Sequence, residues 1–256
     1  MALGLAAAML LSWAEPKLDR YRITVFDVGQ GQAILLQTNE KHYVVDCGGD
    51  SAADAATLVV HTLRSQGVRR LDGLILTHFD QDHADGAQLL LSQIPADALY
   101  LPDNNDSSMI RKALITQWED HIIWIDPNSI HTITDANITL ITAAKASKGN
   151  ESSMCVLFQP DNCDILITGD RDISGERSLL QQISLPDLEI LLVGHHGAAT
   201  STGLELLHAT RPDIAVISAG VNNSYGHPAQ QVLDRLTLYQ CQIYRTDLDG
   251  TIVIRG

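Results

Sequence analysis

The chain is short of positive charge. Against 31 Asp and Glu residues it has 17 Lys and Arg, which gives a formal net charge of −14 over 256 residues. Proteins usually hold nucleic acid with clustered Lys and Arg, which displace the counterions of the phosphates. The composition therefore excludes a generally basic nucleic-acid-binding surface, and any contact with DNA must be local.

Aromatic residues and cysteines are also scarce. Phe, Trp and Tyr make up 5% of the chain, so few stacking platforms for single-stranded DNA are expected. The four cysteines form no C-x-x-C pair, which argues against a zinc knuckle and a dense disulfide framework. We expect them to pack as small apolar side chains. They are Cys47, Cys155, Cys163 and Cys241.

No apolar run is long enough to cross a bilayer, which takes about 20 residues. Met1 to Ala14 are almost wholly apolar, and no Lys or Arg precedes them as in a signal peptide. We interpret residues 1–21 as an apolar segment and linker. Two origins stay open for it: the remnant of a membrane helix, or a segment that packs on the domain or anchors at an interface. Residues 22–256 are long enough for one domain with a sizeable core.

The sequence does contain a regular succession of strand and helix patterns. Residues 22–28, 32–38 and 41–46 predict a β-meander. Further strands are expected over residues 71–77, 98–101, 122–125, 138–142, 154–159, 163–168, 189–193, 213–218, 242–246 and 251–254. Helices are expected over residues 51–67, from 85, over 107–118 and 176–183, and from 202 and 228.

Local signals refine several of these boundaries. Ser51 with Asp54 and Thr202 with Glu205 predict capping boxes, and Pro228 is expected to begin a helix. The last two strands are expected to turn at Asp249-Gly250. Strands first, then mixed strands and helices, indicate an α/β fold in which two sheets pack together with helices outside.

Four potential metal ligands follow the strand expected over residues 71–77: His78, Asp80, Asp82 and His83. Residues i and i+2 of an extended loop can face one ion, and the adjacent Asp-His pair can face a second. A solvated acidic loop with incidental histidines is the alternative interpretation. A cation is the obvious compensation for so many carboxylates, so the loop favours a metal-dependent hydrolase.

The segment from His78 to His83 resembles the His-x-His-x-Asp-His signature of the metallo-β-lactamase superfamily, with Asp80 in place of the second histidine. The resemblance implies the metallo-β-lactamase fold, a four-layer αββα sandwich of two mixed sheets. A carboxylate in place of an imidazole favours oxygen-preferring ions, so manganese competes with zinc.

Further motifs, in this order, resemble the metallo-β-lactamase-like domain of ComEC-type DNA-uptake (competence) channel proteins. They are Phe26-Asp27-Val28-Gly29-Gln30-Gly31-Gln32, Val45-Asp46-Cys47-Gly48-Gly49, Thr168-Gly169-Asp170, Val193-Gly194-His195-His196-Gly197 and Gly226-His227-Pro228. The match spans about residues 22 to 255. The resemblance implies a nuclease that cleaves incoming DNA, the non-transported strand, and a partner membrane channel region in the same or a parent protein. It also implies an inner-membrane location with an extracytoplasmic catalytic domain.

The resemblance further implies a ligand set for one or two divalent ions, Mn or Zn. One ion would bind His78 and Asp80, the other Asp82 and His83, with Asp170 between them. We expect His195 rather than His196 to complete the second site, because His195 comes first after its strand. Two further residues would support the metal site without binding an ion: Asp46 would orient a ligand histidine, and His196 would contact substrate. A turn-initiating Asp46 is the alternative.

Catalytic roles are implied for Asp82, His227, Asn150 and Ser153. Water activated by the ions would attack phosphorus in line, with Asn150 or Ser153 stabilising the phosphoryl charge. His227, before a helix expected from Pro228, would bind phosphate or protonate the leaving oxygen. A plain N-cap is the alternative for His227.

The sequence departs from the family pattern at two places. The superfamily has a histidine between the first motif and Gly-Asp, but no histidine occurs from 132 to 194, and Asn150-Glu151-Ser152-Ser153 stands there instead. The first ion would then have one protein ligand fewer. Gln32 stands where many members have Asp. Two alternatives to a nuclease stay open: a small-substrate hydrolase of the same fold, or a catalytically silent domain that binds metal or partners.

Overall fold

A computed structural model describes residues 19–38, 40–104, 106–143 and 152–256, which form two seven-stranded sheets. The first sheet has the order β14 (Ile252–Arg255), β1 (Tyr21–Val25), β2 (Ala33–Thr38), β3 (His42–Cys47), β4 (Leu71–Ile75), β5 (Ala96–Pro102), β6 (Ile122–Ile125). The second has the order β13 (Gln242–Arg245), β12 (Ile214–Ile217), β11 (Ile190–Leu192), β10 (Ile165–Ile167), β9 (Cys155–Phe158), β8 (Ile138–Ile141), β7 (Ile130–Ile133).

Both sheets are mixed. The strands from β14 to β3 pair antiparallel, whereas β3 to β6 pair parallel. In the second sheet β7 to β10 pair antiparallel and β10 to β13 pair parallel. The β-meander predicted at the start of the chain is thereby confirmed.

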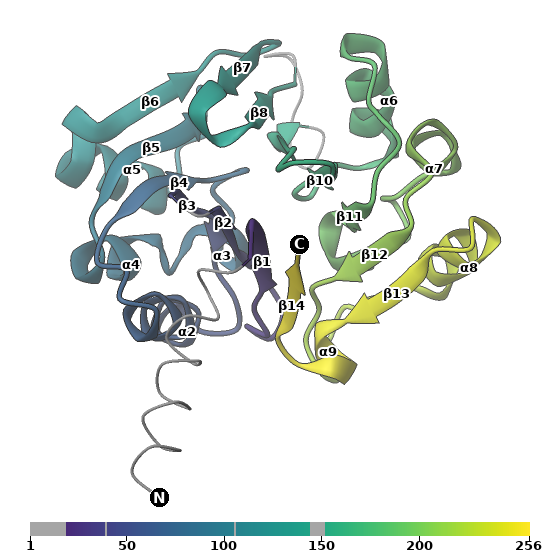
Figure 1. Ribbon diagram of the computed structural model, residues 1–256, viewed down its shortest axis with the longest axis horizontal. Helices are drawn as coiled ribbons and strands as arrows, with labels where there is room; N and C mark the ends of the chain where they lie inside the picture. Colours follow the sequence, from purple (N-terminus) through teal and green to yellow (C-terminus); the bar gives the residue numbers. More distant parts are fainter. Residues whose placement is uncertain (1–18, 39, 105, 144–151) are drawn as a thin grey trace, which may run out of the picture.

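Helices cover the outer face of each sheet (Figure 1). The first sheet carries α2 (Ala52–Ser65), α4 (Ala87–Gln93) and α5 (Met109–Trp118), and the second carries α6 (Ile173–Gln182), α7 (Leu204–Thr210) and α8 (Gln230–Leu238). Two further short helices are α3 (Gln81–Ala84) and α9 (Thr246–Asp249), and 3₁₀ turns occupy Glu119–His121, Thr134–Ala136 and Gly194–Gly197. The predicted four-layer αββα sandwich of two mixed sheets is confirmed.

Alternating side chains on the strands build the three layers of core between these four layers. On β2, Ile34 and Leu36 pack between the two sheets, while Leu35 faces the opposite way and packs with residues of the outer helices. This is the period-2 pattern of a strand buried on both faces. The four cysteines are free and buried, as predicted. Among the described residues, no helix combines the length and apolarity that a membrane span requires.

Local signals failed where tertiary contacts decide the geometry. The last two strands do not form a hairpin: β13 pairs with β12 in the second sheet, and β14 pairs with β1 in the first. The turn predicted at Asp249-Gly250 is the end of α9, which connects the two sheets. Strand β7 was not predicted from the sequence.

Of the three helix starts predicted from local signals, one is right and two are wrong. Ser51 caps α2 by accepting a hydrogen bond from the Asp54 amide, as predicted. Thr202 does not cap α7, which begins at Leu204 with Gly203 as its N-cap. Instead the buried Glu176 carboxylate accepts hydrogen bonds from the Thr202 and Gly203 amides, at 2.5 and 2.8 Å. The helix expected from Pro228 begins at Gln230, so His227 does not stand at its first turn.

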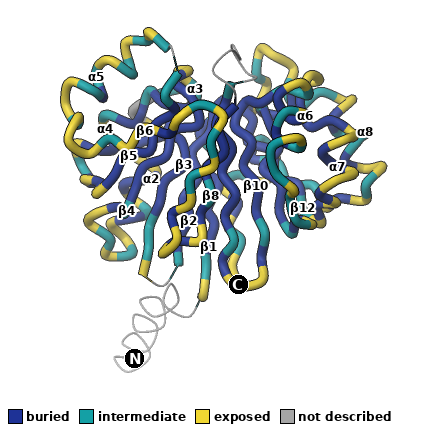
Figure 2. The backbone as a smooth tube through the Cα atoms, turned by 90° about the horizontal axis from the view of Figure 1, so that it is seen from above, coloured by how far each residue is buried: buried dark blue, intermediate teal, exposed yellow. Residues whose placement is uncertain are grey.

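The two ends of the sandwich differ in what they present. Figure 2 shows α3 at one end and the last residue, Gly256, toward the other. The carboxyl ends of β3, β4, β10, β11 and β12 all point to the end that carries α3. Loops that follow parallel strands at such an edge are where side chains from distant parts of a sequence meet.

Candidate metal centre

The predicted ligands lie together in the loops at this end. Asp46 stands at the end of β3, His78 follows β4, Asp170 follows β10, and His195 and His196 follow β11. The two sheets therefore contribute ligands from opposite sides, although the residues from the two sheets are about 90 to 150 positions apart in the chain. We call His78, His83, His195 and His196 with Asp46, Asp80, Asp82 and Asp170 the histidine cluster.

Asp46 is the hydrogen-bonding hub behind the cluster. Its carboxylate is fully buried. One oxygen accepts from the Thr77 amide at 2.7 Å, and the other accepts from the Thr77 hydroxyl at 2.8 Å and from the Gln32 amide nitrogen at 2.8 Å. The same oxygen lies 2.8 Å from His83 Nδ1. Gln32, whose role the sequence did not reveal, thus helps to fix the carboxylate that orients His83.

The outer nitrogens of two histidines have acceptors that fix their tautomers. His83 Nδ1 faces Asp46, and His196 Nδ1 lies 2.9 Å from the Ser218 carbonyl oxygen. An imidazole that donates from Nδ1 presents a lone pair at Nε2. The Nε2 atoms of His83 and His196 lie 3.2 Å apart, so two lone pairs face each other unless a proton or a cation lies between them.

His78 is oriented by the same hub through a hydroxyl. The Thr77 hydroxyl donates to Asp46, so it accepts from His78 Nδ1 at 3.0 Å. His78 Nε2 is then turned inward, where it is buried and has no hydrogen-bond partner among the described residues. Thr77 was missed in the sequence because nothing but its position before His78 marks it.

The inward atoms form two groups, each with all its ligand atoms within 4.8 Å of one another. The inner group is Asp82, His83, Asp170 and His196, and the outer group is His78, Asp80 and Asp82. Asp170 faces both: one oxygen lies 2.9 Å from His83 Nε2, and the other lies 3.9 Å from His78 Nε2. One carboxylate that reaches two groups is the arrangement expected of a bridging ligand.

Charge and unsatisfied atoms in the cluster fit a divalent cation. Asp170 Oδ1 is buried without a properly aligned hydrogen bond from any described residue. Burial opposes ionisation of Asp170, but His83, His196 and His78 outweigh it and hold the pKa of the carboxyl well below its usual range. Nitrogen and carboxylate donors together suit zinc or manganese.

A proton and a metal ion would compete for the inner group. Burial alone would favour neutral His83, but Asp170 and Asp46 outweigh it and raise the pKa of His83 well above its ordinary value. Without an ion, the cluster therefore holds a proton on His83 opposite Asp170. Binding of a cation at Nε2 would displace that proton, which makes metal affinity pH-dependent.

The two adjacent histidines differ from the sequence expectation. His196 is in the inner group and its side chain is 2% exposed, whereas the His195 side chain is 26% exposed and its Nε2 lies 3.5 Å from the other Asp170 oxygen. Both residues adopt left-handed conformations, with φ of 51° and 54°. This strained turn sends the first imidazole to the outer side of Asp170 and the second inward. The placement therefore favours His196, rather than His195, as the inner ligand.

The remaining predicted residues are placed differently. Ser153 is buried, and its hydroxyl has no partner among the described residues. Arg171, also fully buried, fixes this segment by donating to the Ser153 carbonyl oxygen at 2.7 and 3.0 Å. Asn150 lies outside the described residues. The sequence analysis did not single out Arg171, although its position directly after Asp170 could have drawn attention to it.

His227 lies next to the cluster. Its ring centroid is 5.7 Å from that of His195. Burial, and then His195 and His196, lower the pKa of His227. The imidazole is therefore mostly neutral at pH 7, so protonation of a leaving group would require a nearby anion to raise this pKa.

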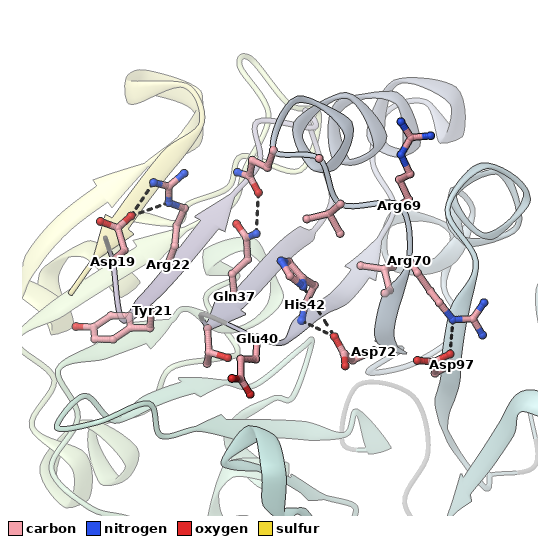
Figure 3. Close-up of a pocket in the computed structure, with 15 residues that line it drawn as sticks. Asp19, Tyr21, Arg22, Gln37, Glu40, His42, Arg69, Arg70, Asp72 and Asp97 are labelled. Carbon is pink, nitrogen blue, oxygen red and sulfur yellow. Dashed lines mark hydrogen bonds and ion pairs between the residues drawn. The ribbon is translucent and has the colours of Figure 1, made fainter. Parts of the chain in front are cut away.

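A cavity of about 820 Å³ lies where β3, β4 and β5 begin, at the end of the first sheet opposite to the histidine cluster. Figure 3 shows the residues that line it. We call it the arginine pocket, with the charged lining residues Asp19, Arg22, Glu40, Arg69, Arg70, Asp72 and Asp97. Three of its carboxylates are paired within the chain: Asp19 with Arg22, Asp72 with Lys41, and Asp97 with Arg70. The arginine pocket thus offers a cation no comparable set of unpaired donors.

Comparison with known proteins agrees with this geometry. Residues 26–221 match the profile of the metallo-beta-lactamase superfamily. The chain is 32% identical over 232 residues to "Competence protein ComA" of Neisseria gonorrhoeae, covering 90% of this chain and 31% of that protein. It is 28% identical over 253 residues to "ComE operon protein 3" of Bacillus subtilis, covering 91% and 33%. The chain thus spans about a third of the length of these relatives.

Among solved structures, the metallo-beta-lactamase fold protein YhfI of Bacillus subtilis superposes with a TM-score of 0.60. The superposition covers 92% of this chain and 100% of YhfI at 12% sequence identity. At that identity the likeness concerns the fold alone, and the chemistry rests on the histidine cluster.

Proposed function

The chain belongs to the metallo-beta-lactamase superfamily, and we propose that it is a metal-dependent phosphodiesterase that cleaves DNA during competence. The observation that carries this proposal is Asp170, whose two oxygens face two groups of inward ligand atoms. Two adjacent ions are the arrangement that stabilises both the attacking and the leaving oxygen in phosphoester hydrolysis. DNA as substrate is supported by the similarity to proteins named for competence.

In this proposal two sets of residues bind one ion each. The inner group of Asp82, His83, Asp170 and His196 would hold one, and His78, Asp80 and Asp170 would hold the other. We add His195 to the outer side, because its Nε2 faces the same Asp170 oxygen as His78 does. This would make up for the histidine missing between residues 132 and 194.

Bound manganese or zinc ions would lower the pKa of a water molecule and neutralise the phosphoryl oxygens. Asp46, through His83 and Thr77, keeps the ligand nitrogens directed inward. We propose that Asn150 or Ser153 binds a phosphoryl oxygen. His227 would donate a proton to the leaving oxygen once the negative phosphate has raised its pKa.

The proposal also concerns the setting of the domain. We propose that it cleaves the non-transported strand of incoming DNA while attached to a membrane channel region on the outer side of the inner membrane. The relatives named for competence are about three times as long as this chain, which leaves room for such a region in them. A net charge of −14 means that the strand must be held by the ions and by local contacts.

The test is cleavage of end-labelled single-stranded and duplex DNA by the full chain, reconstituted with manganese, zinc or magnesium. We expect cleavage with at least one of these ions, none with a chelator, and none for His78→Ala. Leu238→Ala, an exposed residue at the end of α8, serves as the control and should cleave like the wild type.

Failure would have distinguishable forms. Bound metal measured by mass spectrometry without cleavage of DNA would overturn the nuclease, and assays with lactones, thioesters and small phosphodiesters would then test a small-substrate hydrolase. Bound metal without any activity would indicate a silent binding domain. Absence of bound metal in every condition would overturn the enzyme as a whole.

A further inference from the structure

A row of ring contacts connects the histidine cluster to the protein surface. His195 Nε2 lies 3.5 Å from an Asp170 carboxylate oxygen. The His227 ring contacts the His195 ring edge to face, with 5.7 Å between the ring centroids. The Tyr225 ring stacks on the His227 ring, with 5.7 Å between the centroids and an angle of 25° between the ring planes. Asp170 is buried, His195 and His227 are partly exposed, and Tyr225 is 71% exposed. A large aromatic ring is thus held in the open beside the cluster, in a chain that has few aromatic residues.

The loop that carries Tyr225 is fixed by its own hydrogen bonds. The Asn223 side chain donates to the carbonyl oxygens of Gly220 and His227, at 2.9 and 2.6 Å, and accepts from the His227 amide at 3.0 Å. The Gly220 amide donates to the Gln30 side chain, in the loop between β1 and β2, at 3.3 Å. An aromatic side chain on a pre-organised loop binds a flat partner with little loss of conformational entropy.

The loop that carries Tyr225 has no charged side chain apart from the titratable His227. From Ser218 to Gln230 it contains no Lys, Arg, Asp or Glu. The loop itself therefore adds no repulsion of a polyanion, although the chain as a whole is strongly acidic, and it offers no Lys or Arg to hold one. Stacking on a ring is the remaining source of affinity, and every nucleobase offers a face for it.

We propose that Tyr225, backed by His227, is a base-stacking platform for the nucleotide next to the phosphate at the histidine cluster. The proposal rests on the proposed nuclease function and narrows its substrate to unpaired strands or frayed ends, since a paired base has no free face. It predicts little preference for base sequence, because stacking does not read hydrogen-bonding edges.

The test compares wild type, Tyr225→Phe, Tyr225→Leu and Tyr225→Ala on two strands of equal length, oligothymidylate and an oligomer of abasic residues. We expect Tyr225→Ala to lower kcat/KM on oligothymidylate about tenfold, which corresponds to about 1.4 kcal/mol. Tyr225→Phe should stay within about twofold, with Tyr225→Leu between them. On the abasic oligomer the Tyr225→Ala penalty should shrink to less than about twofold.

Controls separate this inference from the proposed function. Leu238→Ala removes an equally exposed side chain, 70% against 71%, and should match wild type on both strands. Equal losses on both strands would mean that Tyr225 only positions His227, and no loss on oligothymidylate would mean that it binds no base. Either result overturns the platform while the nuclease stands. If wild type cleaves neither strand and no duplex DNA either, the proposed function falls. Anisotropy of the labelled strands with the same variants then decides the platform.

Discussion

Carboxylates at the two ends of the first sheet have different partners. In the arginine pocket, Asp19, Asp72 and Asp97 each pair with an Arg or Lys of the chain, and the side chains are partly or largely exposed. In the histidine cluster, Asp46 and Asp170 are buried, and their partners among the described residues are histidines, amides and a hydroxyl. The pocket supplies its own countercharge, whereas the cluster needs a proton or a cation from outside.

This difference is informative because both ends are rich in ionisable groups and only one has the features of a reactive site. Surface ion pairs contribute about 0–1 kcal/mol each, since water already solvates both partners. A buried carboxylate without a countercharge is far more costly, so its persistence indicates that something binds there. Burial and missing partners, rather than cavity size, therefore make the histidine cluster the candidate metal centre.

The largest expected effect comes from Asp46→Ala. The change leaves the Gln32 amide, the Thr77 hydroxyl and His83 Nδ1 without their acceptor. We expect a loss of about 3–5 kcal/mol in the free energy of unfolding. Metal affinity should fall about 10- to 100-fold, because His83 is no longer oriented. Urea denaturation and a competition titration with a metal indicator measure the two quantities.

Asp72→Ala is the matched variant in the arginine pocket, where the carboxylate pairs with Lys41 on the surface. It should cost no more than about 1 kcal/mol and leave metal affinity unchanged. Similar costs for the two variants would remove the distinction between the two ends.

Glu176 tests whether a carboxylate that is merely buried also needs a cation from outside the chain. It lies in neither region, and its oxygens accept from two backbone amides. Burial, only partly offset by these amides, raises its pKa to about 7. Its stabilising contribution is therefore complete below about pH 4.5, where the unfolded chain is also protonated, and is lost as the pH rises toward 7.

Over that range the free energy of unfolding of the wild type should fall relative to Glu176→Gln, by on the order of 3 kcal/mol. Urea denaturation of both proteins between pH 4.5 and 8 in a chelator checks this. A constant difference between them would show that Glu176 is ionised throughout and is satisfied by the amides alone.

Asp170→Asn removes the bridging charge while nearly preserving shape. We expect metal affinity to fall at least about 100-fold. A saturating ion stabilises a protein by about 2.7 kcal/mol at a hundred times its Kd, which should raise the Tm of the wild type by about 5–10 °C. This increment should vanish in Asp170→Asn, and thermal scans with and without chelator measure it.

Asp97→Asn, in the arginine pocket, should keep the full increment, because its carboxylate pairs with Arg70 and is remote from the cluster. An increment that survives in Asp170→Asn would mean that the ion binds elsewhere.

The smallest effect is expected for Arg70→Ala. The Arg70 and Asp97 side chains are 54% and 56% exposed, so the pair is screened by water. We expect a loss below about 1 kcal/mol that shrinks further at high salt. Unfolding measured at two ionic strengths tests this, and a loss of several kcal/mol would reveal a structural role for the pocket.

Much of the fold could be predicted because its signals are local. Alternating apolar residues marked most strands, and Ser51 marked the start of α2 through its hydrogen bond to the Asp54 amide. Predictions failed where a local sequence pattern is compatible with more than one tertiary contact. Asp249-Gly250 favours a hairpin turn, but β14 completes the first sheet beside β1, and β13 pairs with β12 in the second sheet. Thr202 resembles a cap, yet Glu176 from another helix meets its amide.

The sequence by itself determined which ligand side chains are available. It also showed that a carboxylate, Asp80, stands in place of an imidazole, and that four motifs at strand ends are expected in one site. Ligand chemistry depends on residue type, which the sequence states directly. Only the tertiary structure decided which atoms face inward. His195 and His196 are neighbours with identical side chains, and two left-handed residues in one turn separate their roles. Likewise Gln32, Thr77 and Ser218 became part of the site only through packing, since a hydrogen bond depends on where two atoms meet and not on their distance along the chain.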